Sequence, residues 1–154
     1  MLGDSSKIAL VASHTGKVLG SVILGGYAWY PQDAEPMNLS MLWSPTSSHL
    51  ALMVRNTKRT WETRLYAASR KGLLAIELPS ATKSALNLLG EKEIFRCCRE
   101  QPAKWIAEDS LVVRASGDTR LKGNVIWYEV DVTYSVTKRS ISNTKLISTE
   151  PHEG

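Results

Sequence analysis

The alternation of apolar and polar residues is clearest between Ile126 and Val136, where every second residue is apolar. A strict period of two over this length predicts a β-strand with one face in water. The residues Thr137–Ser140 predict a turn, and Ser140–Ser148 is expected to return as the neighbouring strand. We expect a polar loop over Ser116–Gly123, before this strand, and a loose tail over residues 149–154.

A second sheet-forming stretch extends from Leu39 to Leu78. Its run His49–Val54 is apolar on both faces, which is typical of a central strand. A polar loop separates this run from Trp61–Ala68, whose alternation indicates a half-buried strand. A turn that contains a glycine then leads into Leu73–Leu78, so this stretch predicts an antiparallel meander.

Two other stretches repeat parts of this pattern. Residues 7–24 predict a two-stranded hairpin that matches residues 63–80 when shifted by 56 positions, so that Gly16 meets Gly72. Trp105 precedes a polar turn and an apolar strand, as Trp43 does, and the two tryptophans are 62 positions apart. Removal of an insertion of roughly 20 residues leaves about 40, the length of one sheet repeat.

The period changes to that of a helix between these repeats. Ser80 is an N-cap residue for a helical run that Gly90 closes. A second run, Glu91–Gln101, has helical spacing of apolar residues and ends before Pro102. We therefore expect a helical insertion over about residues 80–101 that packs on the sheet. Its inward-facing residues would be Phe95, Cys97 and Cys98.

The order of Trp43, the Ser44-Pro45 turn, an apolar strand and two further strands resembles one blade of a TolB-type β-propeller. In that family the turn often continues with Asp-Gly, whereas here it continues with Thr46 and Ser47. The resemblance covers about residues 40–78 and, in part, 7–24 and 105–148. It implies blade-like antiparallel meanders and a protein of the bacterial envelope, but no particular activity, because propellers host many functions.

Length and composition indicate one globular domain over residues 1–154. The chain is 43% hydrophobic and 22% charged, as is usual for such domains. It is too short for a closed propeller of four or more blades at roughly 40 residues each. We therefore expect a mainly β fold, an incomplete propeller-like assembly of antiparallel meanders with a short α-helical insertion.

Location is left open by the sequence. No apolar run reaches the roughly 20 residues of a membrane span. The first residues lack the pattern of a signal peptide. A periplasmic or secreted protein whose leader was removed, and a cytoplasmic protein, are both compatible with this chain.

The positive charge of the chain is concentrated in residues 55–71. The net charge of the whole chain is +4, while this span carries six basic residues and one acidic residue, a net +5. We expect Arg55, Lys58 and Arg59, with Trp61 at their base, to form a basic tip that binds an anionic partner. A solvated loop that blunts a sheet edge is the alternative interpretation. Nucleic acid is disfavoured because no nucleic-acid-binding motif accompanies the charge.

Three aromatic residues, Tyr27, Trp29 and Tyr30, fall within four positions after two glycines. They favour either a platform for stacking on a sugar or base, or ordinary core packing. The first interpretation leads to an alternative function, a small hydrolase or carbohydrate-active domain.

Candidate catalytic groups are few. Glu129 and Asp131 lie about 7 Å apart on the wet face of their strand, which suits an acid–base pair. Acids at this spacing are also what a solvated face contains, and a cross-strand pairing with Arg or Lys is the alternative. The histidines lack partners at metal-ligand spacing, and the adjacent Cys97 and Cys98 indicate two reduced thiols. We predict no catalytic residue, metal or cofactor.

The sequence therefore favours a non-enzymatic binding module whose partner is a protein. A third possibility is a homodimer, since an incomplete meander has open edges that a second copy would close.

Overall fold

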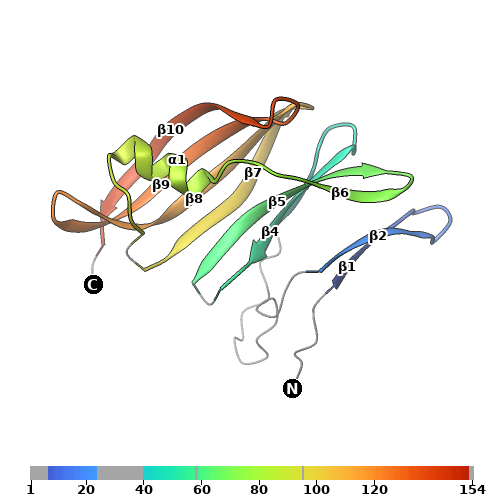
Figure 1. Cartoon of the computed structure of the whole chain (residues 1–154), viewed down its shortest axis with the longest axis horizontal. Coiled ribbons are helices and arrows are strands. Elements are labelled where there is room, and N and C mark those ends of the chain that lie inside the picture. The colour runs from blue at the N-terminus through green and yellow to red at the C-terminus, as the bar shows by residue number, and fades with distance from the viewer. Residues whose placement is uncertain (1–6, 24–39, 58, 95, 153–154) are drawn as a thin grey trace, which may run out of the picture.

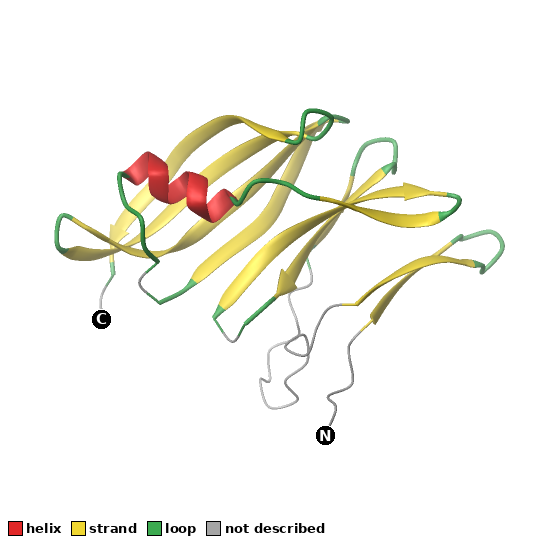
Figure 2. Ribbon diagram, in the orientation of Figure 1, coloured by secondary structure: helices red, strands yellow, loops and turns green. Residues whose placement is uncertain are grey.

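The computed structural model describes residues 7–23, 40–57, 59–94 and 96–152. Strands dominate this part of the chain, which confirms the mainly β prediction (Figure 2). The elements are β1 (Lys7–Val11), β2 (Val18–Ile23), β3 (Met41–Trp43), β4 (His49–Arg55), β5 (Thr60–Ser69), β6 (Gly72–Ile76), α1 (Ala81–Leu89), β7 (Cys98–Ala107), β8 (Ser110–Leu121), β9 (Asn124–Ser135) and β10 (Ser140–Pro151).

The described strands form two four-stranded antiparallel meanders and one separate hairpin (Figure 1). The first meander follows the chain order β3-β4-β5-β6, and the second follows β7-β8-β9-β10. They join into one eight-stranded sheet where β5 and β7 pair in parallel, over only Thr60–Trp61 and Cys98–Arg99. The hairpin β1–β2 forms its own two-stranded sheet beside the first meander.

The two tryptophans of the predicted repeat occupy equivalent places. Trp43 ends β3 and Trp105 lies near the end of β7, the first strand of each meander. After each of them comes a turn and then a strand with long buried stretches, β4 or β8. The indole N–H of Trp105 donates to the carbonyl oxygen of Leu42 (3.3 Å), so the two equivalent strands are also in contact.

Side-chain alternation divides the core into two clusters. In β9, every second residue from Tyr128 to Tyr134 is buried, and these side chains pack beneath α1 with Ala51 and Leu65 of the first meander. On β4 the next residue, Leu52, belongs instead to a second cluster that includes Val22 of the hairpin. The strand β4 contributes side chains to both clusters, which confirms the prediction that this strand is apolar on both faces.

The helix α1 has the predicted caps. The hydroxyl of Ser80 accepts the N–H of Lys83 (3.2 Å), and Gly90 adopts φ of 76° and donates its N–H to the carbonyl of Asn87. Glu100 of β7 adds a second cap, because its carboxylate accepts hydrogen bonds from the Ser80 hydroxyl (2.9 Å) and the Thr82 N–H (2.8 Å). The first turn of the helix is thereby tied to β7.

The prediction of helix beyond Gly90 is wrong, since β7 begins at Cys98. The backbone N–H groups of Arg96 (2.7 Å) and Cys97 (2.8 Å) donate to the carboxylate of Asp118, a long-range contact that replaces helical hydrogen bonds. Pro102 is tolerated inside β7 because it lies beside an irregularity in the pairing with β8 and outside the short pairing with β5. Phe95 lies outside the described residues.

The loop predicted over Ser116–Gly123 is also wrong, because β8 continues to Leu121 and only Lys122 and Gly123 form the turn. Two polar residues of this segment, Asp118 and Thr119, are buried with partners: the carboxylate of Asp118 accepts the N–H groups described above, and the hydroxyl of Thr119 donates to the Glu93 carbonyl (2.7 Å). The returning strand β10 extends to Pro151, so the first part of the expected tail is paired with β9.

Two adjacent carboxylates in the β7–β8 turn bind neighbouring turns. Glu108 accepts hydrogen bonds from the hydroxyls of Ser44 (2.7 Å) and Ser48 and from the N–H of Thr46 (2.9 Å). These bonds, with that of Ser44 first, hold the pKa of Glu108 far below its ordinary value. Asp109 accepts the hydroxyls of Thr137 and Ser135 in the same way, and its pKa is also lowered. The Ser-Pro turn of the first meander is thus fixed to the second meander.

Candidate functional site

The predicted basic tip lies at the β4–β5 loop, where the first meander meets the start of β7. Arg55 ends β4, Arg59 lies in the loop, and Trp61 is the second residue of β5. Lys58 lies outside the described residues, as do Tyr27, Trp29 and Tyr30 of the predicted aromatic platform.

Trp61 is the centre of this arrangement. Arg55 is its cross-strand partner in β4, and the guanidinium carbon of Arg55 lies 5.2 Å from the centroid of the Trp61 ring. Arg99 is its partner on the other side, in β7, with its guanidinium carbon 4.8 Å from the same centroid. Both distances are within the range of cation–π attraction. We call Arg55, Arg59, Arg99 and Trp61 the arginine cluster.

Arg99 was missed by the sequence analysis. It was placed in a predicted helix, 38 positions beyond Trp61, so nothing in the sequence indicated that the two residues are strand neighbours. The alternation of Cys98, Glu100 and Pro102 on one face of β7, with Arg99 on the other, would have indicated a strand at Arg99 but not its pairing with Trp61.

The loop that carries Arg59 is held by local hydrogen bonds. The N–H of Asn56 donates to the Thr60 carbonyl (3.1 Å), and the hydroxyls of Thr57 and Thr60 are 2.6 Å apart. The N–H of Arg59 donates to the Thr57 hydroxyl (3.2 Å), and Nε of Arg55 donates to the Thr57 carbonyl (3.2 Å). The backbone that presents both arginines is therefore ordered by the loop itself.

Two carboxylates near the cluster are engaged elsewhere. Glu62 pairs with Arg64 (Nε to Oε1, 2.8 Å). Asp118 is only 2% exposed and is occupied by the backbone of residues 96 and 97. Burial and then the charge of Asp118 raise the pKa of the Cys97 thiol, whereas the charges of Arg99 and Arg59 act to lower it. Both arginines therefore lie within electrostatic reach of this thiol.

The second basic tip is at the opposite end of β5. Arg70 lies in the tight turn to β6 and is exposed. At about 3.3 Å per residue, the ten residues of β5 separate this turn from the arginine cluster by roughly 30 Å. The two tips are independent surfaces.

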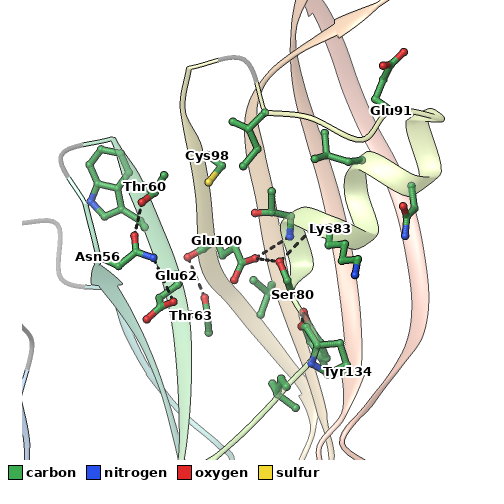
Figure 3. Close-up of a pocket in the computed structure, with 18 of the residues that line it drawn as sticks. Asn56, Thr60, Glu62, Thr63, Ser80, Lys83, Glu91, Cys98, Glu100 and Tyr134 are labelled. Carbon is green, nitrogen blue, oxygen red and sulfur yellow. Dashed lines mark hydrogen bonds between the residues drawn. The ribbon is translucent and has the colours of Figure 1, made fainter.

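A cavity of about 770 Å³ opens between α1, β5 and β7, beside the arginine cluster (Figure 3). Thr60 and Thr63 of β5 line one side, and Cys98 and Glu100 of β7 lie opposite. The hydroxyl of Thr63 bridges the two strands by donating to the Glu100 carbonyl (3.0 Å). This volume is within the usual range for small-molecule sites, roughly 300–1,000 Å³.

Two of the groups with catalytic potential, Asp131 and His49, have structural partners. Asp131 forms an ion pair with Arg114 of β8 (2.8 Å), which is the cross-strand alternative to an acid–base pair. Nδ1 of His49 lies 3.2 Å from the Ser48 hydroxyl and 3.4 Å from Glu108. In a hydrolase triad the serine and the carboxylate contact different nitrogens of the histidine ring. Here Nδ1 of His49 is the nitrogen near both Ser48 and Glu108, so these three residues do not have the triad geometry.

The thiol pKa values of Cys97 and of Cys98 are raised, in both cases chiefly by burial. Within the described ranges, no group of three or more His, Cys, Asp or Glu residues is arranged to hold a metal ion. The one helix of that part of the chain is too short to cross a membrane.

Comparisons of the chain with protein-family models, with curated proteins and with solved structures gave no match.

Proposed function

We propose that this protein is a non-enzymatic interaction module that binds an acidic segment of a partner protein through the arginine cluster. The observation that carries the proposal is the row Arg55–Trp61–Arg99 across three adjacent strands, with Arg59 in the loop beside it. Guanidinium groups bind carboxylates in a planar, two-pronged geometry, and Trp and Arg are the residues that most often dominate binding energy at protein interfaces.

The strand framework favours a rigid surface over an adaptable one. Arg55 lies in β4 and Arg99 in β7, and both strands pair with β5 at Trp61. The sheet therefore fixes the backbone of both arginines. A preorganised surface loses less entropy on binding than a flexible loop does. A protein partner is favoured over nucleic acid because stacking on a base requires an open aromatic face, and two guanidinium groups already lie over Trp61.

The test is the binding of a fluorescently labelled decaglutamate peptide, measured by anisotropy, to the wild type and three charge reversals. Arg99→Glu and Arg59→Glu are expected to weaken binding about tenfold or more. Arg70→Glu is the matched control: it changes the net charge equally at the far end of β5 and is expected to alter affinity by less than about twofold. Binding should also weaken when salt is raised.

Equal losses in all three variants would refute the proposal, because attraction would then depend on net charge alone. The absence of measurable peptide binding would refute it as well. A labelled oligothymidylate of the same length is the second probe, and tighter binding of that probe than of decaglutamate would overturn the assignment to a protein partner.

We propose, in addition, that the two meanders are blade-like units of an incomplete propeller-like assembly. This is supported by two consecutive four-stranded antiparallel meanders and by a hairpin stacked on the first of them. The envelope location follows from the TolB resemblance alone and stays a prediction, as does the homodimer. Light scattering at several protein concentrations tests the latter.

A further inference from the structure

The lining of the cavity between α1, β5 and β7 contains three half-buried carboxylate residues, Glu62, Glu91 and Glu100, and two exposed lysines, Lys83 and Lys92. The exposed lysine ammonium groups remain hydrated and are screened. Glu62 is paired with Arg64 (2.8 Å), and Glu91 lies beyond the C-terminal end of α1, away from Glu100 (Figure 3). The negative charge that a ligand meets between the strands and the helix is therefore that of Glu100.

Glu100 decides the polarity of the site. One of its oxygens caps α1 by accepting hydrogen bonds from Ser80 and Thr82, so the positive end of the helix is already neutralised. An anionic ligand would meet this carboxylate instead of free N–H groups. A ligand that donates hydrogen bonds is the complementary one.

Thr82 points independently to a ligand that donates a hydrogen bond in this cavity. Its residue is only 6% exposed, it lines the cavity, and its hydroxyl oxygen has no hydrogen-bond partner among the described residues. A buried hydroxyl without a partner costs about 1–3 kcal/mol. Cys98, which is also buried and lines the cavity, is its neighbour and offers only a weak sulfur partner.

One part of the lining is apolar. Leu86 of α1 and Val113 of β8 are buried and form part of the main core cluster, and Leu78 is packed against them. Tyr134 contributes its ring, since its hydroxyl is engaged with the Pro79 carbonyl (2.6 Å). This surface suits the hydrocarbon body of a small molecule.

We propose that this cavity is a binding site for a small organic amine with an apolar body. The ammonium group donates hydrogen bonds to the Glu100 carboxylate and to the hydroxyl oxygen of Thr82. The hydrocarbon part lies against Leu86 and Val113. Trp61 lines this cavity and also belongs to the arginine cluster, but Arg99 lies on the face of β7 opposite Cys98 and Glu100 and is not part of the lining.

The test compares three probes of nearly equal size, 2-phenylethylamine, 2-phenylethanol and 3-phenylpropionate. Each is titrated into ¹⁵N-labelled protein, and the shifts of amide resonances from α1, β5 and β7 are followed. The amine is expected to bind about tenfold or more tightly than the alcohol, and the acid is expected to bind most weakly. Equal affinity for amine and acid, or no shift at these amides, would overturn the proposal.

Two nearly isosteric variants and a control sharpen the test. Thr82→Val is expected to raise the unfolding temperature of the free protein, because it removes an unpaired hydroxyl, and yet to weaken amine binding severalfold. Glu100→Gln keeps an oxygen for the helix cap and is expected to abolish the preference for the amine. Glu93→Gln makes the same charge change outside the cavity lining and should leave affinity unchanged.

Unchanged amine affinity in both Thr82→Val and Glu100→Gln would refute this site even if the probe binds elsewhere. Arg99→Glu separates the two proposals, because it should weaken decaglutamate binding while leaving amine affinity within about threefold. A loss of both decaglutamate binding and amine binding in Arg99→Glu would refute the proposal that the amine binds in the cavity without help from Arg99.

Discussion

Replacement of Asp118 tests how the chain brings Arg99 beside Trp61. Asp118 is 2% exposed, and its Oδ1 accepts the backbone N–H groups of Arg96 and Cys97 at 2.7 and 2.8 Å. His152 approaches the other oxygen at 3.6 Å. These contacts fix the two residues that precede β7, so they set the register in which Arg99 reaches β5.

The expected magnitude follows from these two charge-assisted hydrogen bonds. Each contributes about 1.5–3 kcal/mol, and exposure of Arg96 lets water replace part of one when the carboxylate is removed. Asp118→Ala should therefore lower the free energy of unfolding by about 3–5 kcal/mol, a large share of the total for a typical domain. Asp118→Asn keeps the acceptor oxygen and should cost less, about 1–2 kcal/mol.

Urea unfolding followed by tryptophan fluorescence measures both values. The Asn variant should still bind decaglutamate, while the Ala variant should bind weakly even under conditions in which it is folded. A loss below about 1 kcal/mol in Asp118→Ala, or equal losses in the two variants, would refute the reasoning.

Three further predictions address other contacts. The pKa of Glu108 is lower in the folded protein than its ordinary value of 4.5, so the stabilisation by this carboxylate is complete above pH 4.5 and is lost as pH falls below 4.5. Urea midpoints measured from about pH 5 to 2 should therefore decline less steeply in Glu108→Gln than in the wild type. Tyr134→Phe removes the 2.6 Å bond to the Pro79 carbonyl and should cost about 1–3 kcal/mol by urea unfolding, with a cost near zero counting against a buried bond. Gly117→Ala places a Cβ in overlap with the Cys97 carbonyl and should lower stability by about 1–3 kcal/mol, whereas a neutral effect would show that β7 can shift away from β8.

Local patterns were sufficient to predict β4 and β9. The buried positions of β9 alternate along the strand, and β4 is buried on both faces. In each strand the pattern of apolar residues follows the pattern of burial, so it can be read from that strand alone. The caps of α1 at Ser80 and Gly90 are local signals of the same kind.

Long-range contacts account for what the sequence did not predict. Ile94, Cys97 and Cys98 have helical spacing, but Asp118, about 20 positions later, takes the N–H groups that a helix would use. The polar residues of β8 resembled a loop because their partners, such as the carbonyl of Glu93, are remote in sequence. Three of the four residues of the arginine cluster were predictable because they are near one another in the sequence, whereas Arg99 was not, because its pairing with Trp61 joins two meanders.

The most direct test of the proposed function is a map of amide shifts when unlabelled decaglutamate is added to ¹⁵N-labelled protein. The proposal predicts shifts in two segments at once, residues 55–61 and 97–99, with the turn at Arg70 unchanged. Shifts centred on Arg70, or spread evenly over the basic residues, would contradict it.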